Sequence, residues 1–316
     1  MAHTRGTPYN TGDMLGAALT LGAKTVGDFS PTGCHSVAWD AHSPKDGGDR
    51  EKTNEFTKSG YPLGLMLNGE GKRFVDEGID LRNYTYAKFG RAILEQPGGI
   101  AFQIWDKDGQ GWLREEEYRD EIVRKIKGDS IEELARECAK EGLQDPDAFV
   151  QTVEQYNAAV AAHREEKPEA QLNPAIKDGL STQSSKMKLD LAKSNWALPI
   201  VKPPFLAVKV TSGITFTFGG LAINPENAAV LREDDSEIEG LFCAGEMTYV
   251  WRSIRTTSSV YGLARPLTAA RLALARAATR CLAAAVWRRD RQRQRLSWYC
   301  AVNDMTSKPM QCTLTL

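Results

Sequence analysis

The stretch that decides the fold is residues 60–91, which read GYPLGLMLNGEGKRFVDEGIDLRNYTYAKFGR. The apolar run Leu63–Leu67 predicts a buried strand. The turn Asn68–Gly71 follows, because asparagine and glycine tolerate the positive φ of tight turns. The charged residues after the turn have two interpretations. In the first, they form the solvated start of a helix that follows a hairpin; in the second, they belong to a functional site.

The second interpretation rests on a pattern: an apolar strand, then N-x-x-G-x-R-F-x-x-E, then an arginine a few residues later. This pattern resembles the fumarate reductase and succinate dehydrogenase flavoprotein family, and within it the tricarballylate dehydrogenases. The resemblance implies that Arg82 lies against a flavin as the acid/base residue, with one residue more of spacing than in soluble fumarate reductases. It also implies that His35, Thr57 and Lys58 contact the substrate and that Glu77 supports Arg82.

Two of these side chains keep other interpretations. His35 has the order and spacing of the family's substrate histidine, but the Pro-Thr that usually follows is absent. A structural role for His35 therefore stays open, and His42 is a less favoured choice for the same position. Lys58 binds a carboxylate, tunes Arg82 or is simply solvated, and the residues alone do not separate these roles.

Three short motifs resemble the parts of the family that contact FAD. Thr11-Gly12-Asp13 is predicted to cap a helix that ends at Gly22, although Met14 replaces the family's second glycine. The sequences TFGG at 217–220 and AGE at 244–246 resemble the return of the chain into the FAD-binding domain. The resemblance implies FAD as the cofactor, with these contact residues: Thr11, Gly12, Asp13, Gly219, Gly220, Ala244, Gly245 and Glu246.

The implied fold is of the α+β or α/β class: a partial, Rossmann-like FAD-binding domain with an inserted α+β capping domain. We assign residues 1–40 and 214–250 to the FAD-binding domain, residues 41–213 to the capping domain, and residues 251–316 to a basic tail outside the resemblance. The G-x-G-x-x-G motif that holds the FAD pyrophosphate does not occur in the sequence. We therefore expect a chain that is truncated at its N-terminus relative to the family and diverges from it after about residue 248.

Local signals predict several elements of the capping domain. Ser130–Glu133 is a capping box, and Asp145-Pro146 begins a second helix with an apolar stripe. A strand is predicted at 203–210 and a separate, glycine-containing element at 215–224.

Asp106–Glu117 has the oxygens and the glycine spacing of an EF-hand calcium loop. However, Gln110 supplies a neutral ligand, and no helix is predicted to lead into the loop. Our preferred interpretation is a turn between a strand at 101–105 and a helix at 115–127.

The composition favours a globular protein of up to two ordinary domains. The chain has 316 residues, of which 41% are hydrophobic and 26% charged, and its net charge is −1. We find no apolar leader, no run that could span a bilayer, and six separated cysteines without a zinc pattern. We therefore expect a cytoplasmic protein without a metal, membrane or nucleic-acid partner. The oligomeric state is not predicted.

The overall charge hides an uneven distribution. Arg252–Arg295 holds eleven arginines and one acid, a net charge of +10 that leaves −11 for the remainder. A tail that binds nucleic acid or an acidic surface is an alternative function for this segment.

The predicted function is an FAD-dependent oxidoreductase that acts on a C–C bond of a di- or tricarboxylate, such as tricarballylate, fumarate or succinate. Hydride passes to or from flavin N5 while Arg82 handles the proton, and a small carboxylate is the expected partner. Phe216 replaces the reductases' substrate histidine, which disfavours plain fumarate or succinate chemistry. The alternatives are a non-catalytic truncated remnant that binds no FAD, and a family member that acts on another CH–CH bond. A 3-ketosteroid dehydrogenase is an example of the latter and requires a tyrosine base.

Overall fold

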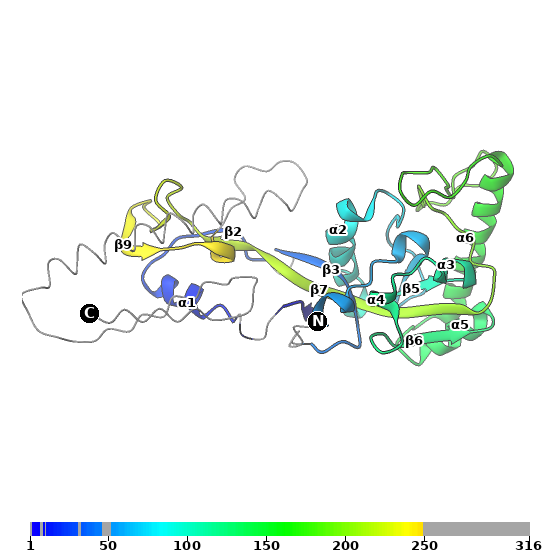
Figure 1. Cartoon of the computed structure of the whole chain (residues 1–316), viewed down its shortest axis with the longest axis horizontal. Helices are drawn as coiled ribbons and strands as arrows, with labels where there is room; N and C mark the ends of the chain where they lie inside the picture. The colour runs from blue at the N-terminus through cyan, green and yellow to red at the C-terminus, as the bar shows by residue number, and fades with distance from the viewer. Residues whose placement is uncertain (1, 7–8, 10, 31–32, 46–51, 249–316) are drawn as a thin grey trace, which may run out of the picture.

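The computed structural model describes residues 2–6, 9, 11–30, 33–45 and 52–248. It is elongated, and one long strand, β7 (Phe205–Leu221), runs from the lobe that holds most helices to the smaller end with α1 and β9 (Figure 1). The predicted basic tail, residues 251–316, lies outside the described residues.

Helices and strands are mixed along the chain, as the predicted fold class requires. The strands are β1 (His3–Thr4), β2 (Thr25–Asp28), β3 (Cys34–Asp40), β4 (Leu65–Asn68), β5 (Ala101–Trp105), β6 (Lys125–Gly128), β7, β8 (Ala229–Leu231) and β9 (Glu237–Phe242). The helices are α1 (Asp13–Thr20), α2 (Arg82–Leu94), α3 (Lys107–Gln110), α4 (Glu115–Tyr118), α5 (Ile131–Ala139) and α6 (Pro146–Glu166). Short 3-10 turns cover Thr53–Phe56, Tyr61–Leu63, Pro97–Gly99 and Gly245–Met247.

β7 organises the main sheet. β5 and β6 pair antiparallel with its first part, β3 pairs antiparallel and β1 parallel with its middle, and β2 pairs antiparallel with its end. β4 extends the sheet by pairing with β5. The sequence predicted two separate elements at 203–210 and 215–224. The structure joins them into one strand, because residues 211–214 between them are also paired with β3.

Helices cover both faces of the sheet in the larger lobe. Leu65 and Leu67 of β4 are fully buried in a cluster with α5 and α6, whereas Met66 between them faces Phe89 and Ile93 of α2. This alternation follows from the period of two along a strand. Each large apolar side chain buried in this way stabilises the fold by about 1.5–3 kcal/mol.

Two of the three predicted helices of this lobe are confirmed with their caps. The Ser130 hydroxyl accepts a hydrogen bond from the backbone N–H of Glu133 at 3.1 Å, and α5 follows. The Asp145 carboxylate accepts from the N–H of Ala148 at 2.9 Å, and α6 follows. The predicted helix at 115–127 is wrong, since α4 ends after four residues and residues 125–128 pair with β7 as β6.

The predicted turn after β4 is confirmed, and its residue types have a clear cause. The Asn68 side-chain oxygen accepts from the backbone N–H groups of Glu70 and Lys72, at 3.0 Å each. Gly71 has φ of 76°, and a Cβ there would lie 2.5 Å from the backbone nitrogen of Phe149 in α6. Only glycine meets both demands, so this turn fixes how the β4 segment packs against α6.

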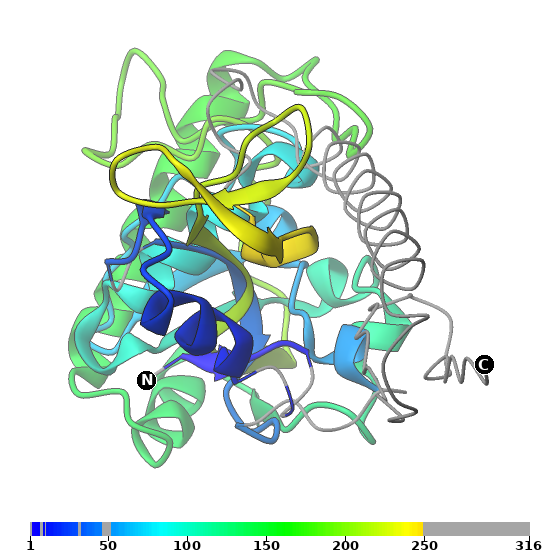
Figure 2. The ribbon, with the colours of Figure 1, turned by 90° about the vertical axis from the view of Figure 1, so that its left-hand side faces the viewer.

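The smaller end has its own hydrophobic cluster, formed by residues such as Ala18, Leu221 and Val230. Figure 2 shows the β8–β9 hairpin beside α1. The predicted helix at Asp13 is confirmed, and its N-cap lies within the predicted Thr11-Gly12-Asp13 motif. Gly12 is the N-cap without a side-chain hydrogen bond, and the helix buries Ala18 while Met14 stays 65% exposed.

Candidate active site

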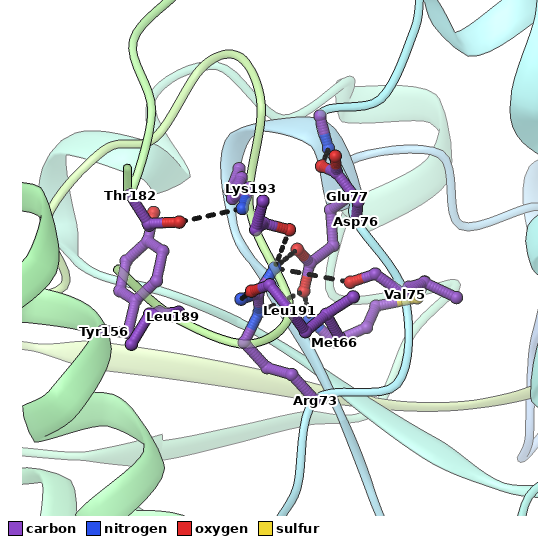
Figure 3. Close-up of polar contacts among 12 residues, drawn as sticks. Met66, Arg73, Val75, Asp76, Glu77, Tyr156, Thr182, Leu189, Leu191 and Lys193 are labelled. Carbon is purple, nitrogen blue, oxygen red and sulfur yellow. Dashed lines mark hydrogen bonds and ion pairs between the residues drawn. The ribbon is translucent and has the colours of Figure 1, made fainter. Parts of the chain in front are cut away.

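The R-F-x-x-E part of the motif forms a buried ion pair (Figure 3). Arg73 Nη2 lies 2.6 Å from Glu77 Oε2, and the two side chains are 5% and 0% exposed. Glu77 Oε1 also accepts from the backbone N–H of Met66 at 2.9 Å. Arg73 donates further to the carbonyl oxygens of Leu191 and Ala192. These bonds hold the loop around residue 192 against β4, so the pair has a structural role.

This pairing corrects one prediction. Glu77 was expected to support Arg82, but its carboxylate is bound by Arg73 and by the backbone of Met66. The carboxylate beside Arg82 belongs to Glu117 of α4, with Arg82 Nη1 at 3.8 Å from Glu117 Oε1.

Arg82 is the first residue of α2 and lines a cleft of about 330 Å³. This volume lies at the lower end of the range for small-molecule sites. Trp112, which is 53% exposed, forms part of the wall. The cleft is lined by Ser59, Gly60, Pro62, Leu63, Leu81, Arg82, Trp112, Arg114, Pro174 and Trp196. Among the predicted substrate and catalytic residues, Arg82 alone is part of this lining.

Glu117 holds the wall of the cleft in place. Its Oε2 accepts from the backbone N–H and the hydroxyl of Ser59, at 2.8 and 2.5 Å. Its Oε1 accepts from Arg114 Nη1 at 3.1 Å. The next residue, Tyr118, accepts from the N–H of Gly60 at 2.8 Å. One buried carboxylate therefore faces two guanidinium groups, which leaves the cleft rich in positive charge.

Arg5 adds a further cation near this cluster, although it was not among the predicted site residues. Its Nη2 donates to the Asn54 side-chain oxygen at 2.8 Å, and its guanidinium lies 5.9 Å from the centre of the Trp39 ring. Burial lowers the pKa of Arg5, and the nearby positive charge of Arg82 lowers it further. β1 and the neighbouring segments thus bring Arg5 from the N-terminus into the electrostatic field of Arg82.

His35 lies at the irregularity in β3 where its register with β7 shifts. Its ring packs edge-on against Tyr86 and Phe216, with centroids 5.0 and 5.5 Å away. Burial lowers the pKa of His35, and the charge of Arg5 acts in the same direction. The imidazole is therefore neutral near pH 7. Its Nδ1 has no hydrogen-bond partner within the described part of the chain.

Lys58 is fully buried, so its interpretation as a solvated side chain is wrong. Its ammonium donates to the carbonyl oxygens of Glu55 and Thr57, at 2.8 and 3.3 Å, and lies 5.5 Å from the Tyr118 ring. Burial lowers the pKa of Lys58 to about 8, and nearby carboxylates oppose this shift. The buried Thr57 hydroxyl has no hydrogen-bond partner among the residues that the structure describes.

The structure brings two of the FAD-related motifs together. The Glu246 carboxylate accepts from the backbone N–H of Thr217 at 2.9 Å, which ties the AGE turn to the TFGG segment of β7. Burial raises the pKa of Glu246. Gly245 and Gly12 both have φ of 81°, and beyond their chain neighbours no described residue has an atom within 4 Å of where a Cβ would be. Ala244 precedes this turn in extended conformation.

These open glycine turns fit the close approach of a planar group to the backbone, as FAD requires. The other predicted contacts have partners within the chain. The Thr11 hydroxyl donates to the Asp13 carboxylate at 2.8 Å. Gly219 and Gly220 pair with β2, and a Cβ at Gly219 would lie 2.7 Å from the Phe29 ring. Packing against Phe29 therefore accounts for the glycine at 219.

The EF-hand alternative is contradicted by the positions of its end ligands. Asp106 caps α3 by accepting from the N–H of Gly109 at 2.9 Å, and Glu117 is directed at Ser59. The predicted strand before the loop is confirmed as β5. Across the described ranges, no group of three His, Cys, Asp or Glu side chains is placed to hold a metal ion.

A protein-family model described as an FAD binding domain matches residues 1–265. The chain belongs to this family. It is 29% identical over 238 residues to a probable fumarate reductase, Ifc3, of Shewanella frigidimarina. The aligned region covers 75% of this chain and 33% of that protein. It is 26% identical over 265 residues to a 3-oxosteroid 1-dehydrogenase of Mycolicibacterium smegmatis, covering 78% of this chain and 42% of the relative. The chain therefore spans less than half the length of these relatives.

Solved structures agree with this assignment. The open conformation of a flavocytochrome c3 fumarate reductase superposes with a TM-score of 0.52 and 26% identity, over 78% of this chain and 36% of that one. A 3-ketosteroid delta1-dehydrogenase from Sterolibacterium denitrificans has a TM-score of 0.57 at 24% identity, over 88% and 48% of the two chains, which shows the fold alone.

These comparisons confirm the predicted fumarate reductase type of flavoprotein, its mixed α/β fold and FAD as the cofactor of the family. The narrower resemblance to tricarballylate dehydrogenases stays a prediction. None of the described helices is long and apolar enough to cross a membrane.

Proposed function

We propose that the chain is part of an FAD-dependent oxidoreductase that acts on a C–C bond of a di- or tricarboxylate. The observation that carries the proposal is the cleft at the start of α2, where Arg82 shares one buried carboxylate, Glu117, with a second arginine. Guanidinium groups in excess of carboxylates favour an anionic ligand, and their planar geometry suits a carboxylate. The fumarate reductase names of relatives support the same substrate class.

In this proposal FAD, when bound, takes up or supplies the hydride. The residues of the chain bind the carboxylates and handle the proton on the neighbouring carbon. We assign this proton transfer to the Arg82 guanidinium. Glu117 orients that guanidinium and is itself fixed by Ser59. Arginine is a weak acid in water, so exclusion of solvent around Arg82 is part of the proposal.

The test is to saturate the purified chain with FAD, remove free cofactor, and measure bound flavin by its visible absorbance. Dye-coupled oxidation of tricarballylate and succinate then reports turnover. We expect Arg82→Ala to abolish turnover while flavin stays bound. Normal turnover of Arg82→Ala would remove Arg82 from the mechanism, and a colourless wild-type protein would favour the non-catalytic remnant.

A second candidate is a family member that acts on a C–C bond beside a ketone. The favouring observation is the aromatic surface of Tyr86 and Phe216 around neutral His35, which suits an apolar ring better than a carboxylate. Tyr86 would be the tyrosine base. This candidate predicts dye reduction with a 3-ketosteroid and none with tricarballylate, and loss of that activity in Tyr86→Phe.

We also keep the division into an FAD-binding part, residues 1–40 and 214–250, and a capping part, residues 41–213, as a proposal. The separate hydrophobic cluster around Ala18 and Leu221 supports it. Limited proteolysis that cleaves near residues 41 and 213 before other sites would agree with this division.

A further inference from the structure

The loop that resembles an EF-hand has another use in this fold. Three of its residues, Trp112, Arg114 and Glu117, lie at the Arg82 cleft. We propose that Arg114 is a second carboxylate-binding residue of this cleft and that Trp112 forms its apolar wall, so that the ligand is a short aliphatic polycarboxylate. The reaction assigned to this ligand rests on the proposed function, whereas its binding does not.

The two arginines are close because they share one oxygen atom. Glu117 Oε1 lies 3.1 Å from Arg114 Nη1 and 3.8 Å from Arg82 Nη1. The two guanidinium nitrogens are therefore separated by no more than these distances added together. Arg82 comes from the start of α2 and Arg114 from the residue before α4. The cleft thus presents two guanidinium groups from different elements, an arrangement that suits a ligand with two carboxylates.

The charge around Glu117 favours an added anion. The Glu117 side chain is 5% exposed, and its other oxygen is already taken by Ser59. Its field also reaches Arg5 and Lys58. Of these cations, Lys58 also has Asp40 and Glu55 nearby, whereas Arg82 and Arg114 meet at Glu117.

Within the described part of the chain, Arg114 forms one other ion pair, with Glu116, whose carboxylate lies 3.5 Å from Arg114 Nε. Both side chains are more than half exposed. Such a surface pair contributes little, because water screens it and an entering ligand displaces it at low cost. Glu116 therefore does not satisfy Arg114 in the way that Glu77 satisfies Arg73.

The remaining wall of the cleft is apolar. Trp112 is 53% exposed beside Leu63, Leu81 and Pro174. An exposed tryptophan in a concave site is a surface on which carbon atoms of a ligand pack. Paired guanidinium groups alone would accept phosphate equally well, so this apolar wall is what points to a carbon skeleton between carboxylates.

The test is calorimetric titration of the whole chain with tricarballylate, backed by tryptophan fluorescence. We expect Arg114→Gln to weaken binding about 10- to 100-fold, the loss typical of a charge-assisted hydrogen bond. The matched control is Arg124→Gln, since Arg124 is also exposed and forms an ion pair, with Glu141, but does not line the cleft. It should bind within about two-fold of wild type.

Trp112→Ala, which removes the apolar wall, should weaken calorimetric binding and reduce the fluorescence change, which places the ligand at this wall. Wild-type protein that does not bind tricarballylate, Arg114→Gln that binds like wild type, or inorganic phosphate that binds as tightly as tricarballylate would each overturn the inference. Thermal melting of each variant controls for folding. Because the Arg114 side chain is 55% exposed, we expect Arg114→Gln to fold like wild type.

The outcome also separates this inference from the proposed reaction. Binding that depends on Arg114 without turnover of any carboxylate supports the inference and refutes the reaction. Turnover of tricarballylate with an unchanged KM in Arg114→Gln refutes the inference and supports the reaction.

Discussion

Arg73 and Arg82 belong to the same stretch of sequence but have opposite surroundings. Arg73 is 5% exposed, lies 2.6 Å from Glu77 and donates to several backbone carbonyls. Arg82 is 40% exposed, and the carboxylate paired with it among the described residues, that of Glu117, lies 3.8 Å away. The first arginine is saturated with partners inside the protein, whereas the second keeps donors for a ligand. Arg73 is therefore part of a rigid support, whereas Arg82 is exposed to a ligand in the cleft.

The physical reason is the cost of removing charges from water. A buried guanidinium is tolerated only when its hydrogen bonds are satisfied, as those of Arg73 are. A guanidinium at a cleft retains water and can exchange it for a ligand carboxylate. Substitutions at the two sites should therefore affect different quantities: the free energy of unfolding at Arg73, and binding or turnover at Arg82.

The largest effect on stability is expected for Glu77→Gln, because it leaves Arg73 as an uncompensated buried charge. We expect a loss of about 3–5 kcal/mol in the free energy of unfolding, measured by urea denaturation. The control is Glu70→Gln, whose side chain is 48% exposed and 3.8 Å from Lys72. It should change stability by less than about 1 kcal/mol. Equal effects of the two substitutions would show that the Arg73 pair is not a structural support.

The second largest effect on stability is expected in the turn after β4, at Gly71. Gly71→Ala forces φ of 76° on an alanine and places its Cβ against the backbone of Phe149. We expect a loss of about 1–3 kcal/mol. Gly69→Ala in the same turn is the control, because the nearest atom to its Cβ would be 3.7 Å away and its φ is not positive. The two variants are compared by thermal melting. Similar melting temperatures would contradict the close packing of Gly71 against Phe149.

Lys193, buried beside the Arg73 pair, gives a prediction about pH (Figure 3). Burial lowers its pKa to about 8 in the folded chain, against 10.5 when it is solvated. Between these values the unfolded chain holds more protons, so this group's contribution to stability rises with pH. We expect the stability of wild type relative to Lys193→Met to increase from pH 8 to 10.5. A difference that is flat or falls with pH over this window would contradict the assignment.

The smallest effect on stability is expected at the open site. Arg82→Gln removes a side chain that is 40% exposed and has one distant carboxylate partner. The free energy of unfolding should change by less than about 1 kcal/mol, measured by the same urea titration. A loss as large as that of Glu77→Gln would mean that Arg82 is part of the support and not a ligand-binding group.

The sequence predicted what local signals encode. The turn at Asn68 and the capped helices α5 and α6 followed from residue types within a few positions of one another. Arg73 and Glu77 are only four positions apart, so their pair is also local in sequence, although the two residues lie outside any helix. The implied family role of Glu77 led us to assign it to Arg82 instead.

The partners of Arg82 were beyond local reasoning. Arg114 and Glu117 come after α2, β5 and α3 in the chain. They reach Arg82 because α4 packs against residues 59–60 through Glu117 and Tyr118. The same holds for β7, whose middle residues carry no strong strand signal but are paired with β3. Contacts between distant segments set the site, and one sequence does not reveal them.

The role of Arg82 in the reaction is tested by anaerobic mixing of the FAD-loaded chain with excess tricarballylate while flavin absorbance is followed. We expect wild type to lose the absorbance of oxidised flavin. Arg82→Gln, with the same bound flavin and the same stability, should do so slower by about 10²–10⁴-fold. Bleaching of Arg82→Gln at the wild-type rate would show that Arg82 does not handle the proton.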